Sequence, residues 1–219
     1  MNYVAKIIKY DEVSGSLLVA PTEEINRELL QKQVNDIEIR LNDGRTISAD
    51  QRRKIFAIIA DIAKYSGDAP EYIRQILTWY FCTEFNVDFF SLSDVDMTTA
   101  REFITYLIEF CFDWNVPTRD TLLHQTDDIG RYLYLCLEHR KCAVCNAKAE
   151  IHHVDRVGMG RDREKIVHIG LKAIALCPKC HRLAHSDEKT FFEENHIYGI
   201  KLDKYLCDVL NLNTKNRKE

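Results

Sequence analysis

Two Cys-x-x-Cys pairs, Cys142/Cys145 and Cys177/Cys180, constrain this chain more than any other feature. Two thiolates at this spacing on a tight turn can bind one tetrahedral Zn²⁺ ion, and two such turns complete an all-thiolate site. We therefore predict a structural Zn²⁺ ion held by these four cysteines. The segment between the pairs is longer than a minimal zinc ribbon requires, so further structure is expected inside it.

Histidines surround the second cysteine pair. His152 and His153 lie between the two pairs, and His181 and His185 follow the second pair. Residues four apart on a helix lie on the same face, so His181 and His185 can point at a single ion that is not the thiolate-bound zinc. The sequence therefore predicts two different metal sites close together in the chain.

This arrangement resembles the HNH endonuclease family, in the version whose ββα-metal finger is stapled by a structural zinc. The resemblance covers about residues 138–187 and rests on three motifs in order: Cys-x-x-Cys, His-His-x-Asp and Leu-Cys-x-x-Cys-His-x-x-x-His. It implies hydrolysis of DNA phosphodiester bonds with a catalytic divalent ion, Mg²⁺ or Mn²⁺ or another. By position, His152, His181 and His185 become its ligands and His153 the general base. Such hydrolysis needs a base that is neutral near pH 7 and a cation that offsets negative charge.

One position departs from the family pattern. The family has an asparagine five residues before the second cysteine pair, and this chain has Lys172 there. His168, a few residues earlier, can take the middle catalytic role, or can instead contact phosphate or support a neighbouring residue. For the whole region the alternative is a treble-clef zinc module that binds nucleic acid or protein without cutting.

The segment 156–163, Arg-Val-Gly-Met-Gly-Arg-Asp-Arg, lies between the histidine dyad and the second cysteine pair. Glycine admits close approach of a DNA backbone, and arginine pairs with phosphate oxygens. We therefore predict DNA contacts in this part of the chain, from Arg156, Arg161, Arg163 and Lys172.

Charge is unevenly distributed along the chain, whose net charge is −4. Residues 140–219 carry 16 lysines and arginines against 11 aspartates and glutamates, whereas residues 1–139 carry 14 against 23. The basic part coincides with the nuclease-like motifs, as contact with a phosphate backbone requires. The densest basic run in the acidic part is Arg52, Arg53 and Lys54.

The first 118 residues predict an α+β domain with a short sheet and three or four helices. Alternating segments near 2–10 and 16–20 flank a turn, and a helix near 22–32 and a strand near 36–41 follow. Three amphipathic helices come next. The first opens with a capping box at Ser48-Ala-Asp-Gln51, the second runs over about 70–85, and the third opens with a capping box at Thr99-Ala-Arg-Glu102. In the second helix the side chains expected to face inward are Ile73, Ile76, Leu77 and Tyr80.

This layout resembles the lambda-phage Orf (NinB) family of recombination mediators. The features that carry the resemblance are Asp50-Gln-Arg-Arg-Lys54, a helix with Trp79, Thr99-x-x-Glu-Phe-x-x-x-Leu-Ile-Glu109 and an exit through Asp113-Trp-Asn-Val-Pro117. It implies a ring-like homodimer that binds single-stranded DNA and cooperates with the host single-strand-binding protein. Arg52, Arg53 and Lys54 would then contact DNA, and a solvated helix face is the alternative.

The remaining segments set the context. Residues 119–139 are predicted as a helix that holds the module at 140–219 in a defined orientation, with further helices near 187–195 and 201–210 and a polar tail. No signal peptide is evident, and no apolar run approaches bilayer length. Four cysteines fall in apolar helical patterns, where packing is the expected role, and this favours a reducing cytoplasm: Cys82, Cys111, Cys136 and Cys207.

The sequence therefore predicts an α+β protein of phage or prophage origin in the bacterial cytoplasm. In it, an Orf-like single-strand-binding domain (1–118) is joined by a connecting helix (119–139) to a zinc-stapled, treble-clef-like HNH nuclease domain (140–219). Its expected substrate is single-stranded or branched DNA. One alternative is a recombination mediator that does not cut, with the finger only adding DNA affinity. A third reading is an endonuclease that its N-terminal half merely dimerises.

Overall fold

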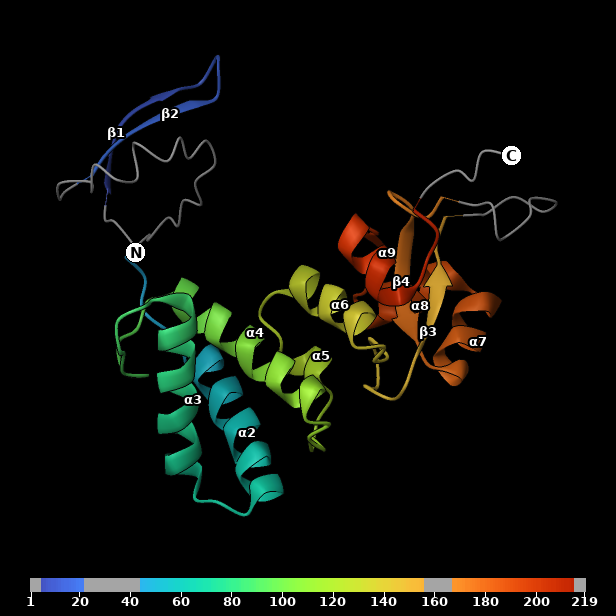
Figure 1. Cartoon of the computed structure of the whole chain (residues 1–219), viewed down its shortest axis with the longest axis horizontal. Helices are drawn as coiled ribbons and strands as arrows, with labels where there is room; N and C mark the ends of the chain where they lie inside the picture. The colour runs from blue at the N-terminus through green and yellow to red at the C-terminus, as the bar shows by residue number, and fades with distance from the viewer. Residues whose placement is uncertain (1–4, 22–43, 156–166, 215–219) are drawn as a thin grey trace.

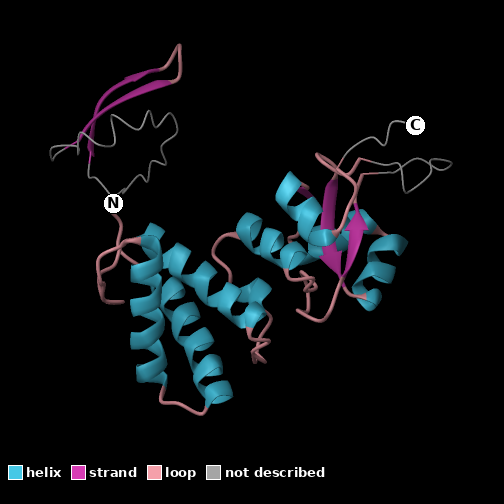
Figure 2. Cartoon of the chain, in the orientation of Figure 1, coloured by secondary structure: helices cyan, strands magenta, loops and turns pink. Residues whose placement is uncertain are grey.

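The computed structural model describes residues 5–21, 44–155 and 167–214 (Figure 1). Within these ranges the chain forms eight helices, one two-stranded sheet and one three-stranded sheet (Figure 2). The expected mixture of helices and strands is confirmed. The predicted helix near 22–32 and strand near 36–41 lie outside the described residues. Among the described helices, none combines the length and apolar character needed to cross a membrane.

The first described segment is an antiparallel hairpin of β1 (Ala5–Asp11) and β2 (Ser16–Pro21). The Asp11 carboxylate accepts hydrogen bonds from the backbone N–H groups of Val13 and Ser14, at 3.0 and 3.1 Å. Gly15 has a φ of +67°, a left-handed conformation that glycine adopts without steric cost. The turn therefore forms where the sequence places it.

Helix α2 (Ala49–Ser66) begins at the predicted capping box. The Ser48 hydroxyl accepts from the Gln51 backbone N–H at 3.1 Å, and the Gln51 side-chain oxygen accepts from the Ser48 N–H at 3.0 Å. These two bonds satisfy donors that the start of a helix otherwise leaves unpaired. The apolar face predicted for this helix is buried, at Ile55, Ile58, Ile59 and Ile62.

Helix α3 (Pro70–Phe85) has the predicted bounds but a different inward face. Ile73 and Leu77 are buried, and the next buried position is Phe81, which is fully enclosed. The spacing of these three residues is four, so they lie in one row along the helix. Tyr80 falls outside this row and is 48% exposed, so its predicted inward orientation is wrong.

Helix α4 (Met97–Asp113) begins earlier than predicted. The Asp96 carboxylate accepts from the N–H groups of Thr98 and Thr99, at 3.0 and 2.9 Å, and so acts as the N-cap. Thr99 is already inside the helix, so the predicted capping box at 99–102 is wrong. α4 packs against α2 and α3. Burial of apolar side chains on all three helices stabilises this arrangement.

The connection predicted as one helix over 119–139 is broken in two, α5 (Leu122–Gln125) and α6 (Ile129–Glu138). Asp128 caps α6 by accepting from the Arg131 N–H at 3.0 Å, and the Thr126 hydroxyl donates to the Asp128 carbonyl at 3.1 Å. Such local bonds compete with helical ones and end the first helix. α6 contacts α4 on one side and β4 and α9 on the other.

The C-terminal part is a small antiparallel sheet in the order β3 (Glu150–His153), β4 (Lys172–Leu176) and β5 (Ile200–Lys201). Its helices are α7 (Pro178–Ser186), α8 (Glu188–Asn195) and α9 (Lys204–Leu210), and α7 contacts both β3 and β4 (Figure 1). α9 begins three residues later than predicted because Asp203 caps it. A buried apolar cluster runs from α2–α4 through α6 to β4.

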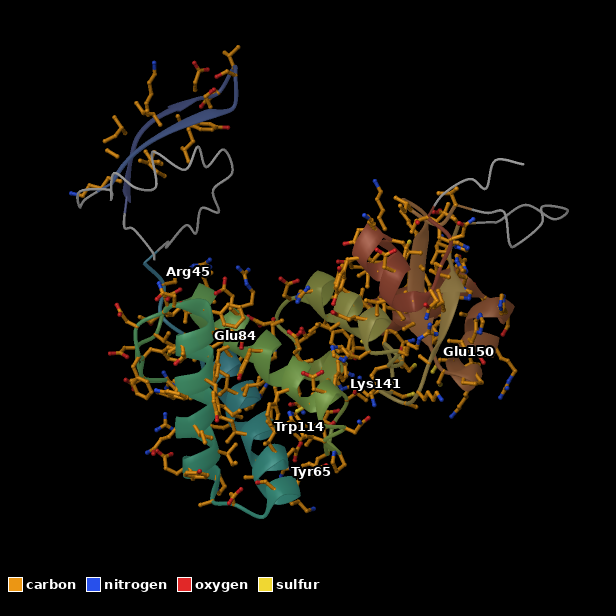
Figure 3. The ribbon with its side chains drawn as sticks, viewed as in Figure 1. Arg45, Tyr65, Glu84, Trp114, Lys141 and Glu150 are labelled. Carbon is orange, nitrogen blue, oxygen red and sulfur yellow. The ribbon has the colours of Figure 1, made fainter. Side chains whose placement is uncertain are left out.

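A polar contact joins the first cysteine turn to the end of α4. The Lys141 ammonium group donates to the Asn115 side-chain oxygen at 2.6 Å. Lys141 lies between the end of α4 and the loop that leads to β3 (Figure 3). The division into domains at residues 118 and 140 stays a prediction.

Candidate functional site

The four predicted zinc ligands come together from two turns. Cys142 and Cys145 lie between α6 and β3, and Cys177 and Cys180 lie where β4 passes into α7. One ligand atom from each lies within 4.8 Å of the others, and none of the four forms a disulfide. The Sγ atoms of Cys145 and Cys177 are 3.6 Å apart. Zinc–sulfur bonds of roughly 2.3 Å in a tetrahedron put sulfurs about 3.8 Å apart, so this cluster fits Zn²⁺.

The start of α7 prepares one of these sulfurs for metal binding. Cys177 is the N-cap of α7, and its Sγ accepts from the Cys180 backbone N–H at 3.5 Å. Burial opposes ionisation of the Cys177 thiol, but hydrogen bonds from Cys180 and the neighbouring thiols outweigh it and bring its pKa to about 7. Because the thiolate is the form that binds metal, this local geometry favours a zinc ligand.

The three predicted ligands of the catalytic metal also meet. His152 comes from β3 and His181 and His185 from successive turns of α7, and one ligand atom from each lies within 4.8 Å of the others. The ring centroid of His152 is 4.9 Å from that of His181 and 5.0 Å from that of His185. The predicted helical face of His181 and His185 therefore forms, and the strand supplies the third imidazole.

His152 has the environment of a metal ligand. It is 3% exposed, and its Nε2 lies 2.7 Å from Oε2 of Glu188. Its buried Nδ1 has no hydrogen-bond partner within the described ranges. Burial lowers the pKa of His152, so the ring is neutral and one nitrogen keeps a lone pair. A buried nitrogen without a partner costs about 1–3 kcal/mol. A metal ion bound at Nδ1 would satisfy it, and the three imidazoles lie close enough together to share one ion, so the residues present fit such an ion.

A second carboxylate lies beside this histidine cluster. Oε2 of Glu150 is 3.3 Å from Nδ1 of His181. Glu150 lies where β3 approaches α7 (Figure 3). Sequence reasoning missed both Glu150 and Glu188. Strand alternation could have indicated Glu150, which is two residues before His152 and hence on the same face. Glu188 begins the next helix, so no spacing rule points to it.

The proposed general base meets another histidine. Nε2 of His153 lies 3.0 Å from Nδ1 of His168, which burial gives a lowered pKa. Lys172, at the family's asparagine position, is exposed, and its backbone N–H donates to Oδ2 of Asp155 at 2.6 Å. The ring of His153 therefore pairs with His168 in this structure, which brings that side chain to the proposed base.

Two of the residues predicted to bind DNA make polar contacts within the chain. Arg52 donates to the carbonyl oxygens of Leu92 and Ser93, at 2.8 and 3.0 Å. Arg53 pairs with Asp50 on the same helix. Both arginines therefore already have polar partners within the chain. Arg156, Arg161 and Arg163 lie outside the described residues.

Lys54 is much more enclosed than its neighbour Arg53. Its ammonium group is 2.9 Å from Asp50 and 3.2 Å from Asp127, and it donates to the Thr126 carbonyl at 3.0 Å. Its side chain is 15% exposed. The neighbouring Gln51 also donates to Asp127, at 2.7 Å. The first turn of α2 is therefore tied to the break between α5 and α6.

Comparison with known proteins supports the nuclease assignment. Residues 20–213 match the model of a protein family described as "Putative HNHc nuclease". Searches of curated proteins and of solved structures give no match. The family match spans most of the chain and includes both the cysteine cluster and the histidines of β3 and α7. The chain therefore belongs to this HNHc nuclease family.

Proposed function

We propose that this protein is a metal-dependent endonuclease that hydrolyses DNA phosphodiester bonds. His152, His181 and His185 would hold the catalytic metal, and His153 with His168 would manage the proton of the attacking water. The observation that carries this proposal is the cluster of three imidazoles, in which the buried Nδ1 of His152 has no hydrogen-bond partner among the described residues. His153, the next residue in β3, pairs with the imidazole of His168.

A bound divalent ion would offset the negative charge that develops on the scissile phosphate and the leaving oxygen. The donor set also bears on which ion binds. Imidazole nitrogen suits Zn²⁺, Ni²⁺ and Fe²⁺, whereas Mg²⁺ prefers oxygen ligands and keeps several waters. Three imidazoles therefore favour one of the former ions over Mg²⁺ in this site. The four thiolates would hold a separate structural Zn²⁺.

The His153–His168 pair is suited to accept a proton. Each neutral imidazole has one N–H, so in the 3.0 Å contact one ring donates and the other accepts. The pair can then take one further proton from the water whose oxygen attacks phosphorus. As that bond forms, the bond from phosphorus to the leaving oxygen breaks, and the leaving oxygen takes a proton from solvent.

The competing function is a recombination mediator that binds single-stranded DNA without cutting it. Lys172 in place of the family's asparagine favours this alternative, while the contact of His168 with His153 offers a replacement for the missing side chain. Phage origin, a homodimer and a host single-strand-binding partner are proposals that rest on the resemblance of residues 1–118 alone. A cytoplasmic location is a proposal that rests on the four cysteines expected to pack as free thiols.

The test is cleavage of supercoiled, single-stranded and branched DNA by purified protein, with Zn²⁺, Ni²⁺, Mn²⁺, Mg²⁺ or chelator. We expect cutting that requires a divalent ion. His152→Ala should weaken metal binding, so extra metal should restore part of its rate. His124→Ala is the matched control, because His124 is exposed and pairs with Asp120. No cutting of any DNA form with any ion would favour the mediator.

A further inference from the structure

Glu188 lies at the junction of two helices, directly beside the histidine cluster. Asp187 ends α7 and also caps α8, where its carboxylate accepts from the Thr190 N–H at 3.1 Å. Because one residue serves both helices, the chain turns sharply and α8 packs against α7. This turn places the first side chain of α8 close to the ligands that α7 carries.

Glu188 makes a short contact with His152, one of the proposed metal ligands. Its Oε2 lies 2.7 Å from Nε2 of His152, within the range of a charge-assisted hydrogen bond. A carboxylate only accepts hydrogen bonds, so the proton in this contact must lie on Nε2 of His152. The proton is then absent from Nδ1, which is left with its lone pair.

A proton on Nε2 also explains why Nδ1, the other ring nitrogen of His152, keeps a free lone pair. Nδ1 of His152 is buried and has no hydrogen-bond partner among the residues that the structure describes. If the ring were free to choose its tautomer or to rotate, it could present a proton to the neighbouring imidazoles instead. Hydrogen bonding of one imidazole nitrogen to a carboxylate is a general way to fix the other nitrogen as a metal ligand.

We propose that Glu188 is a positioning residue for the catalytic metal. It holds His152 as the Nε2–H tautomer and aims the Nδ1 lone pair at the ion shared with His181 and His185. Glu188 does not touch the ion or the substrate in this role and acts only through His152. The inference rests on the proposed function and deepens it.

Two substitutions separate the parts of this role. Glu188→Ala removes both the acceptor and its charge, whereas Glu188→Gln keeps an oxygen that can accept from Nε2 but removes the charge. The matched control is Glu194→Gln, on an exposed position of the same helix. Zinc content and circular dichroism of each variant check that the module remains folded.

The first measurement is binding of Ni²⁺ alone, by titration calorimetry, to protein that retains its thiolate-bound zinc. His152→Ala identifies the heat that belongs to the histidine site. Loss of a carboxylate behind a metal-binding histidine typically weakens affinity by roughly 10–100-fold. We expect that loss for Glu188→Ala, a smaller loss for Glu188→Gln and none for Glu194→Gln. Affinity equal to wild type in Glu188→Ala would overturn the proposal.

The second measurement is the tautomer of His152 in the absence of Ni²⁺, read from long-range ¹H–¹⁵N NMR spectra. We expect the Nε2–H form in wild type and a mixture of forms in Glu188→Ala, a change that a purely structural role would not cause. A wild-type ring protonated at Nδ1, or no Ni²⁺ binding at this cluster, would also overturn the proposal.

Cleavage assays distinguish the two levels of inference. If the wild type binds Ni²⁺ and Glu188→Ala shows both effects while no DNA is cut, the positioning role stands and the proposed nuclease activity fails. If the wild type cuts DNA with a divalent ion and Glu188→Ala binds Ni²⁺ as tightly as wild type, the activity stands and the positioning role fails.

Discussion

The cysteine cluster and the histidine cluster lie in the same small module but differ in how completely the chain encloses and satisfies them. The cysteine cluster offers four thiols, three of them buried, which is the full ligand set of a closed structural zinc site. The histidine cluster offers three imidazoles, with His185 exposed and Nδ1 of His152 unpaired in the part of the chain that the structure describes. Catalytic sites have this open form because substrate or water must also reach the ion.

The two clusters also join different parts of the chain. The cysteines connect the turn after α6 to the turn before α7, so they staple the module across its sequence. The histidines connect β3 to α7. These two elements are already held together, because β3 pairs with β4 and α7 packs on both strands. We therefore expect loss of a cysteine to disrupt the fold, and loss of a histidine to affect chemistry while the fold survives.

The largest expected effect is that of Cys177→Ser. This change removes a zinc ligand, and a site with three thiolates holds the ion less tightly. A loss of about 4 kcal/mol would lower the Tm by roughly 10 °C for a chain of this size. Zinc analysis should find one ion per wild-type chain and much less in the variant, and calorimetry should record the lower Tm.

The control for this prediction is Cys82→Ser. Cys82 is also buried, but its sulfur faces the Asp88 carbonyl at 3.6 Å and is not part of the cysteine cluster. It should retain a full zinc complement. Equal zinc content in Cys177→Ser and wild type would show that the cysteine cluster is not the zinc site.

The second expected effect is the loss of cleavage in His153→Ala. Removing a general base typically slows a reaction by about 10²–10⁴-fold, and the three histidines proposed to bind the metal remain in place. His168→Ala should slow cleavage less, because it removes only the partner of the base. Cleavage rates at saturating metal test this, and zinc content and thermal stability should be close to wild type. Cleavage by His153→Ala at the wild-type rate would assign the base to another residue.

The contrast between these clusters was largely accessible from sequence, because ligand spacing reports local geometry. Two Cys-x-x-Cys turns and a His-x-x-x-His helix each depend on neighbours only a few residues away. Contacts that depend on distant packing were not accessible in this way. Glu188 meets His152 across 36 residues, and Lys54 meets Asp127 across 73, so neither pair follows from a repeat or a motif.

The same reasoning accounts for the errors in the helical part. The predicted single helix over 119–139 has continuous apolar spacing, but Asp128 and Thr126 form local bonds that interrupt it. The predicted inward position of Tyr80 depended on choosing one of two adjacent helical rows. The bulk of Phe81, packed against Phe103 at 5.2 Å between ring centroids, decides that choice. Periodicity gives the helix, and tertiary packing selects its face.

The third prediction concerns the pH dependence of cleavage. Burial places the pKa of His168 below its usual value of 6.5. The pair of His168 and His153 can accept a proton from water only while it is not already protonated. Cleavage at saturating metal should therefore fall by about tenfold per pH unit once the pair becomes protonated, and burial of His168 moves that decline to lower pH. A decline that begins well above pH 6.5 in rate measurements would contradict this, and His168→Ala should shift the decline.

The smallest expected effect applies the same contrast to the basic run of α2. The ammonium group of Lys54 is satisfied by contacts within the chain, so we predict a structural role for it. Lys54→Ala should reduce the free energy of unfolding by about 1 kcal/mol, because its contacts with Asp127 and Thr126 are lost. Arg53 has a side chain that is 79% exposed and pairs only with Asp50 in the described structure, so Arg53→Ala should leave stability within about 0.5 kcal/mol of wild type.

Denaturant unfolding measures both values, and single-stranded DNA binding at several salt concentrations measures the alternative role. If Arg53→Ala weakens binding and flattens its salt dependence, the outer side of this turn contacts phosphate, as the resemblance of residues 1–118 implies. If neither variant changes DNA binding and only Lys54→Ala lowers stability, the run serves to fasten α2 to the break before α6, and DNA contact belongs to the C-terminal module.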